Sequence, residues 1–134
     1  MHTLTVLIID DDPDSLEQIN EYVKYGGYSS ILANSGFEAL DIVEKEELEA
    51  IIIDAVMPDM NGLEVIRKLR KKCKTKNIPI IMISVLGPDT KLMLEPDSQA
   101  NYYLSKPYSG KELQIVLDKL TTPDTCRKLV NSNP

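Results

Sequence analysis

Several acidic, hydroxyl and lysine side chains directly follow runs of apolar residues in this 134-residue chain. The run VLII precedes Asp10, Asp11 and Asp12, the run AIII precedes Asp54, the run IPIIMI precedes Ser84, and the segment NYYLS precedes Lys106 and Pro107. Adjacent carboxylates repel one another unless water or a cation neutralises them. Because this set offers oxygen ligands and no histidine or cysteine, it suits a hard cation, Mg²⁺ more than Zn²⁺.

The same residue types fit the transfer of a phosphoryl group. Mg²⁺ takes few protein carboxylates and leaves ligand positions for water and phosphate oxygens. A carboxylate such as Asp54 can attack phosphorus and become an aspartyl phosphate. Lys106 and the cation would neutralise the transferred oxygens, and Ser84 can donate a hydrogen bond to them.

Each of these residues, taken alone, has an ordinary structural explanation. An acidic strand end is more often a helix cap or a solvated loop than a metal site, and Asp12 followed by Pro13 fits an N-cap. A Lys-Pro pair is usually a surface turn. Only the placement of all of them at strand ends favours a functional site.

The elements that must position these residues alternate between strands and helices. Strands are predicted at 4–9, 28–33, 50–54, 78–84 and 101–105. Helical spacing marks five helices. The first contains Leu16, Ile19 and Val23 and is ended by Gly26 and Gly27, and the second contains Phe37, Leu40 and Val43 and is capped by Ser35 or Asn34. The third contains Ile66, Leu69 and Cys73, the fourth lies around Leu92 and Leu94, and the last contains Leu113, Val116, Leu117 and Leu120.

This alternation predicts βαβ units and a mostly parallel sheet with right-handed crossovers. The third and fourth strands are apolar on both faces, as expected when helices cover both sides of a sheet. In such a sheet ligands bind beyond the carboxyl ends of the strands. The polar residues at those ends are therefore expected on a single rim.

Composition limits the function classes. The net charge of −6 argues against a general nucleic-acid binder, although residues 67–76, RKLRKKCKTK, form a basic run that we interpret as a solvated helix face. No apolar run approaches the ~20 residues that cross a bilayer. The two cysteines show no zinc or disulfide spacing, which favours a reducing cytoplasm. His2 is the only histidine.

Four segments together resemble the receiver domain of response regulators, the phosphorylatable part of two-component signalling systems. They are LIIDDDP, IIIDAVMPDMNGLEVIRKLR, IPIIMIS and YYLSKPY, and the resemblance covers roughly residues 4–120. It implies a doubly wound, flavodoxin-like α/β fold whose five parallel strands lie in the order 2-1-3-4-5, with five helices. Residues 1–122 would form the receiver domain, and residues 123–134 a short, flexible polar tail.

The resemblance also implies roles for the site residues. Asp54 would be the phosphoacceptor, and Mg²⁺ would be bound by Asp11, Asp54, the backbone carbonyl of Val56 and, often through water, Asp10. Lys106 would contact the phosphoryl oxygens, and the bond before Pro107 would be cis. Ser84 would be the switch hydroxyl, and Tyr103 the aromatic side chain that changes rotamer with it.

The partners follow from the same resemblance. The chain would catalyse only its own phosphorylation and dephosphorylation, taking the phosphoryl group from a histidine kinase or a histidine phosphotransfer protein, since His2 is unsuited as the donor. The face formed by the helix around Leu92 and Leu94, strand 101–105 and the last helix would then bind an effector, a fused output domain or a second copy of the chain. No direct nucleic-acid or membrane contact is expected.

Three other interpretations compete with this one. A flavodoxin-like cofactor carrier shares the sheet order, but three aspartates would repel a phosphate that lacks a metal. A metal-dependent aspartyl phosphatase would favour a second acid two residues after the nucleophile, where this chain has Val56. A receiver-like scaffold that is never phosphorylated would not need Asp10, Asp11, Asp54, Ser84 and Lys106 together.

Two features depart from the receiver pattern. Val85 stands after Ser84 where a small residue is usual, and together with Leu86 and Val56 it could ring the phosphoryl site with apolar side chains. We expect this ring to hinder the hydrolytic water and to give a long-lived aspartyl phosphate. The segment DSQAN before the last strand lacks a common glycine, so the preceding helix is expected to end differently.

Overall fold

Five short apolar segments pair as one parallel sheet in a computed structural model that describes residues 4–85 and 99–121. The strands are β1 (Thr5–Ile9), β2 (Ser29–Ala33), β3 (Ala50–Asp54), β4 (Ile80–Ser84) and β5 (Tyr102–Ser105). Their order is β2-β1-β3-β4-β5, which confirms the predicted order and fold class. β1, β3 and β4 lie inside the sheet, and β2 and β5 form its edges.

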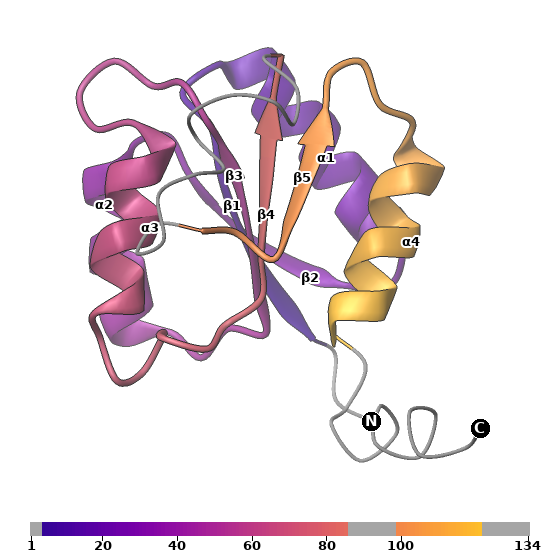
Figure 1. Ribbon diagram of the computed structural model, residues 1–134. Coiled ribbons are helices and arrows are strands. Elements are labelled where there is room, and N and C mark those ends of the chain that lie inside the picture. Colours follow the sequence, from indigo (N-terminus) through magenta and orange to yellow (C-terminus); the bar gives the residue numbers. More distant parts are fainter. Residues whose placement is uncertain (1–3, 86–98, 122–134) are drawn as a thin grey trace.

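Helices cover both faces of the sheet (Figure 1). The described helices are α1 (Pro13–Tyr25), α2 (Gly36–Lys45), α3 (Gly62–Arg70) and α4 (Gly110–Thr121). α1 and α4 pack on one face, where Ile8 and Ile52 contribute to the core, and α2 and α3 pack on the other, with Ile9 and Ile53. Successive strand residues point to opposite faces, so apolar runs fill both cores. The helix expected around Leu92 and Leu94 lies outside the described residues.

Side-chain caps fix where the helices begin. The Asp12 carboxylate accepts a hydrogen bond from the backbone N–H of Asp14, Ser35 caps α2 through Glu38, and Asn61 caps α3. α1 ends at Gly26 and Gly27, and Gly27 has a φ of 94°, a conformation that other residues rarely adopt. The predicted Asp12 cap and glycine stop are therefore confirmed.

The predicted end of α3 is wrong. The helix ends at Arg70, and Cys73 is exposed in the turn that follows it. The Thr75 hydroxyl donates a buried hydrogen bond of 2.6 Å to the Leu69 carbonyl, which also accepts from the Lys72 N–H at 3.2 Å instead of from the Cys73 N–H of a continuing α-helix. This bond closes the helix one turn before the apolar spacing suggests.

The predicted start of β4 also needs correction. β4 begins at Ile80 rather than at Ile78, because the Ile78 N–H bonds back to the Thr75 carbonyl in the preceding turn. Phe37 belongs to α2 but is 60% exposed, so it does not contribute to the buried face of the helix. The tight approach of Gly36 to Val65 closes that end of the helix against α3 instead.

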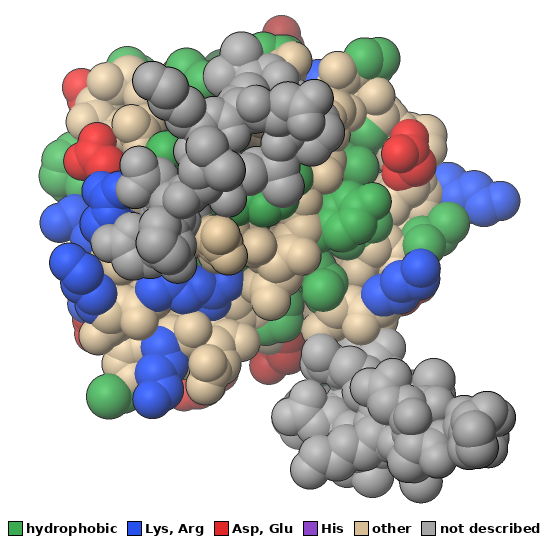
Figure 2. Space-filling model, in the orientation of Figure 1, with side chains coloured by type: hydrophobic (Ala, Val, Ile, Leu, Met, Phe, Trp, Pro, Cys, Tyr) green, Lys and Arg blue, Asp and Glu red, His purple; other side chains and the backbone are tan. Residues whose placement is uncertain are grey.

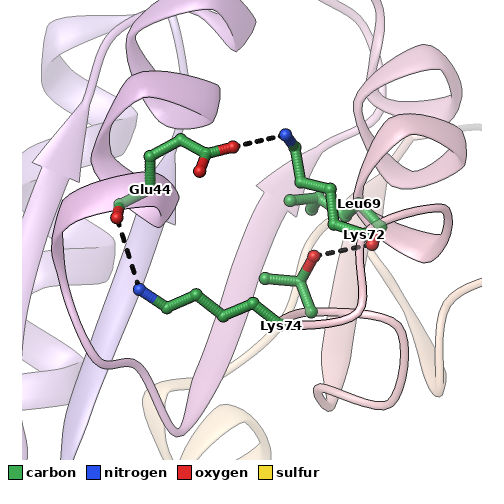
Figure 3. A network of polar contacts seen from close by, with 5 residues as sticks. Glu44, Leu69, Lys72 and Lys74 are labelled. Carbon is green, nitrogen blue, oxygen red and sulfur yellow. Dashed lines mark hydrogen bonds and ion pairs between the residues drawn. The ribbon is translucent and has the colours of Figure 1, made fainter.

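A polar network joins the end of α2 to the turn after α3 (Figure 3). Lys72 donates to the Glu44 carboxylate, and Lys74 donates to the Glu44 carbonyl at 3.5 Å and lies 3.8 Å from the Glu47 carboxylate. Lys72 lowers the pKa of Glu44. These are exposed contacts, which contribute little to stability.

Arg70 is an exception within the basic run, which we interpreted as a solvated face. Its guanidinium donates hydrogen bonds to the carbonyls of Lys76 (3.2 Å), Ile78 (2.7 Å) and Gln99 (3.3 Å), and to Asn101 Oδ1 (2.8 Å). The planar five-donor fork suits such a set of acceptors. Arg70 therefore ties the turn after α3 to the chain that leads into β5, while other lysine and arginine side chains gather on the surface (Figure 2).

Replacing Arg70 by methionine should lower the free energy of unfolding by about 1–3 kcal/mol, because the partly buried Ile78 carbonyl would lose its donor and three exposed contacts would be lost with it. Lys68→Met is the matched control, since Lys68 is an exposed cation on the same helix, and it should change stability by about 0.5 kcal/mol or less. Urea unfolding followed by circular dichroism measures both. Equal effects of the two substitutions would show that the Arg70 contacts add nothing.

Candidate functional site

Three carboxylates meet at the carboxyl ends of two neighbouring strands. Asp10 and Asp11 follow β1, and Asp54 is the last residue of β3. The parallel register pairs Ile9 with Ile53, which brings these strand ends side by side. Each of the three residues offers a carboxylate oxygen within 4.8 Å of the others. The structure thus places together the acids that the sequence assigned to one rim.

Burial makes this cluster electrostatically unfavourable. Asp10 is 1% exposed and the Asp54 side chain 13% exposed, whereas Asp11 faces solvent. Burial and then the charge of Asp10 raise the pKa of Asp54, Lys106 opposes them, and the charge of Asp11 adds to the rise. The balance remains toward a raised pKa, so Lys106 alone does not compensate the negative charge.

Lys106 reaches the cluster from the loop after β5. Its Nζ lies 3.5 Å from Asp54 Oδ1, and its backbone N–H donates to the Ser84 carbonyl at 2.9 Å. The peptide bond between Lys106 and Pro107 is cis. Ser84 ends β4 and is 7% exposed. Ser84 and Lys106 therefore lie on the same rim as the carboxylates.

The remaining predicted residues lie in different settings. Val56 and Val85 are 62% and 66% exposed, so both present apolar surface to solvent, while Leu86 lies outside the described residues. Tyr103 packs against the core under α2 and α3, and its hydroxyl accepts a 3.0 Å hydrogen bond from the Ala100 N–H. The Tyr103 ring thus lies on the face of the sheet that α2 and α3 cover.

Two contributions to the site were not found from the sequence. The Ser15 hydroxyl donates to Asp10 Oδ2 at 2.6 Å, and the Asp12 N–H donates to Asp10 Oδ1 at 3.0 Å. A Cβ at Gly62 would lie 2.7 Å from the Asp54 carbonyl oxygen, so only glycine lets α3 begin this close to Asp54. In the sequence, the only indication of the role of Ser15 is that its hydroxyl lies in the first helical turn after the acidic end of a strand.

An open cleft lies beside the carboxylate cluster. It is lined from the start of α1 by Asp12, Asp14, Ser15 and Gln18, and from the loop after β5 by Lys106, Pro107 and Tyr108. Tyr108 is half-buried against Tyr22, with ring centroids 6.2 Å apart in an edge-to-face arrangement. The cleft thus borders the cluster through Ser15, which bonds to Asp10, and through Lys106, which lies 3.5 Å from Asp54.

The donor set fits Mg²⁺. The clustered ligand atoms are carboxylate oxygens, two of them from largely buried residues, with no histidine or cysteine among them. Such oxygens are the ligands of a hard divalent cation. A cation here would also offset the repulsion that raises the pKa of Asp54.

Comparison with known proteins agrees with this geometry. Residues 6–118 match the response regulator receiver domain family. The chain belongs to this family. The response regulator MprA of Mycolicibacterium vanbaalenii is 34% identical over 122 residues, which are 89% of this chain and 52% of the relative. MprA of Mycobacterium leprae is 32% identical, over 95% of this chain and 56% of the relative.

Solved structures of receiver proteins have the same fold. The chemotaxis response regulator CheY4 of Vibrio cholerae is 27% identical with a TM-score of 0.82, covering 89% of this chain and 99% of its own. A response regulator receiver domain of Francisella is 30% identical with a TM-score of 0.80, covering 89% and 97%. The receiver domain described here spans about half the length of the curated relatives it matches.

Membership fixes the general role. This is a receiver domain of two-component response regulators. No helix among residues 4–85 and 99–121 is long and apolar enough to cross a bilayer.

The raised pKa of Asp54 predicts a gain in stability when this residue is neutral. An acid with a raised pKa binds more protons in the folded state than in the unfolded state. The free energy of unfolding therefore falls as the pH rises from the ordinary pKa toward the pKa of the folded state. Asp54→Asn should therefore unfold at a higher temperature than the wild type at pH 7 without Mg²⁺. The difference should vanish near pH 3, where the carboxyl is neutral in both states.

Differential scanning calorimetry at the two pH values checks this expectation. Asp59→Asn is the control, because Asp59 is an exposed acid in the loop after β3, and it should change little. A variant Asp54→Asn that is less stable than the wild type at pH 7 would mean that its contact with Lys106 outweighs burial and repulsion.

Proposed function

We propose that Asp54 is the phosphoacceptor of this receiver domain and that Asp11, Asp54, Asp10 and the backbone carbonyl of Val56 hold the Mg²⁺ it requires. The observation that carries this proposal is the convergence of three carboxylates within 4.8 Å, with the Lys106 ammonium 3.5 Å from Asp54. A bound cation supplies positive charge at the point where phosphoryl oxygens would otherwise meet carboxylates.

The reaction is a direct transfer between two side chains. An Asp54 carboxylate oxygen forms a bond to the phosphorus of a phosphohistidine on the partner, and the phosphorus–nitrogen bond breaks. The imidazole nitrogen keeps the electron pair and takes up a proton. Lys106 lies on the Asp54 side of the reacting group and neutralises transferred oxygens, while the Ser84 hydroxyl donates a hydrogen bond to one of them.

The proposed partners follow from access and from family membership. The phosphodonor is a histidine kinase or a histidine phosphotransfer protein, and the open cleft between the start of α1 and the loop after β5 admits its histidine. The setting is the cytoplasm. The receiver domain remains a single-turnover catalyst of its own phosphorylation and dephosphorylation.

The proposed output is a change at the β5–α4 surface. Ser84 and Lys106 gain a phosphoryl partner, the carboxyl ends of β4 and β5 draw together, and Tyr103 follows Ser84. Hydrophobic side chains gather over β5 and α4 (Figure 2), where Tyr102 is 44% and Ile115 45% exposed. This surface is suited to an effector, a fused output domain or a phosphorylation-dependent second copy of the chain.

Incubation with Mg²⁺ and acetyl phosphate should add the mass of one phosphoryl group to the intact protein. The addition should be absent in Asp54→Asn and in excess EDTA, because the first removes the nucleophile and the second the cation. Lys106→Ala should fold normally, since Lys106 is partly exposed, but should react more slowly. A phosphorylated Asp54→Asn protein would place the acceptor elsewhere, and an unmodified wild type would oppose the proposal.

The exposed valines at the rim predict a long-lived phosphoryl group. Val56→Asn should hydrolyse about tenfold faster, a change of ~1.4 kcal/mol in the barrier, because a polar side chain can orient the attacking water. Loss of the phosphorylated mass after removal of the donor gives the rate. Ile115→Asn is the control, since Ile115 is equally apolar and exposed on α4. A wild-type lifetime of seconds would rule out protection by these side chains.

A further inference from the structure

The Asp10 carboxylate is held by protein donors on both of its oxygens. Ser15 Oγ donates to Oδ2 at 2.6 Å, and the Asp12 backbone N–H donates to Oδ1 at 3.0 Å. Asp10 is 1% exposed, so water cannot easily replace either donor. Two hydrogen bonds from different directions fix both the position and the plane of this carboxylate.

The chain supplies these donors through the turn that joins β1 to α1. Asp12 is the N-cap and Pro13 the first residue of α1, so Ser15 lies in the first helical turn. Side chains in a helix lean toward its N-terminus, which directs Ser15 back over the end of β1. The hydroxyl therefore bonds to a carboxylate five residues earlier rather than to its own helix backbone.

We propose that Ser15 is a positioning residue for Mg²⁺ binding, acting through Asp10. This inference rests on the proposed function of the site. Ser15 contacts no phosphoryl group in this role. It fixes the carboxylate that must coordinate the cation or accept a hydrogen bond from a water bound to it. A carboxylate has about four acceptor positions, so the two bonds from Ser15 and Asp12 leave others for the cation, and one Asp10 oxygen lies within 4.8 Å of oxygens of Asp11 and Asp54.

The charge of the cluster explains why such a donor is needed. Asp10 is almost fully buried and faces two further acids, and its negative charge raises the pKa of Asp54. Without the Ser15 hydroxyl, Asp10 would keep one donor and could rotate about it, away from Asp11 and Asp54. The cation would then have to reorder the carboxylate on binding, which lowers its affinity.

A purely structural role for Ser15 makes a different prediction. If its bond to Asp10 only stabilises the start of α1, removal of the hydroxyl should cost stability and leave Mg²⁺ affinity unchanged. Ser35 provides the matched comparison, because its hydroxyl accepts from the Glu38 N–H at 3.1 Å as the N-cap of α2, on the opposite face of the sheet. Ser35→Ala removes a hydroxyl at the start of a helix without affecting the carboxylates.

The first measurement is the dissociation constant of Mg²⁺ by isothermal titration calorimetry of the full chain. Ser15→Ala should weaken binding roughly tenfold, the scale found for residues that orient metal ligands. Ser15→Thr keeps the hydroxyl and should restore binding to within about twofold of the wild type. Ser35→Ala should lower the unfolding temperature and leave the dissociation constant unchanged.

A second measurement needs no cation. The amide proton of Asp12 donates to Asp10 Oδ1, so its NMR chemical shift reports whether that carboxylate has turned. The Asp12 amide should shift in metal-free Ser15→Ala and return to the wild-type position in Ser15→Thr. Ser35→Ala should leave it in place.

The outcomes separate this inference from the proposed function. If the wild type binds no Mg²⁺, the proposed function fails. If the wild type binds but Ser15→Ala binds equally or more tightly, or if Ser15→Thr is as weak as Ser15→Ala, the role of Ser15 is overturned while the proposed function stands. The positioning role of Ser15 is supported if Ser15→Ala binds Mg²⁺ more weakly, Ser15→Thr restores the binding, and the Asp12 amide shifts to match.

Discussion

Repulsion among three carboxylates at one edge of the sheet is the constraint on which the site depends. Asp54 has a raised pKa although Lys106 lies 3.5 Å away, because burial and Asp10 outweigh that single positive charge. A folded domain tolerates such a cluster when a bound cation offsets it or when the function requires its reactivity. Both would apply in the proposed function, where the same carboxylates hold Mg²⁺ and Asp54 accepts the phosphoryl group.

The sheet has the rigidity to hold these charges together. β1 and β3 are neighbours inside it, and their apolar side chains are fully buried in two separate cores. Close-packed interiors do not deform to let charged groups separate. The register that pairs Ile9 with Ile53 therefore sets the separation of Asp10 from Asp54. Gly62 extends this control to the backbone of Asp54, since any Cβ there would meet its carbonyl oxygen.

Much of this arrangement could be predicted from sequence, because parallel strands end at a common edge and Asp54, Ser84 and Lys106 each mark such an end. The exceptions depend on hydrogen bonds between distant groups. Nothing in a basic run distinguishes Arg70, whose acceptors include Gln99 and Asn101, from its solvated neighbours. The Thr75 hydroxyl sets the end of α3, and the spacing of apolar residues gives no sign of this hydrogen bond.

β5 connects the site to the rest of the molecule. At its carboxyl end the Lys106 N–H bonds to the Ser84 carbonyl, and at its other end Asn101 accepts from Arg70 and from the Ile80 N–H. The Tyr103 hydroxyl holds Ala100 just before the strand. As an edge strand, β5 pairs only with β4 within the sheet. In the proposed function, a displacement of Lys106 toward a phosphoryl group would therefore be transmitted along this anchored strand to Tyr103 and to the exposed side chain of Tyr102.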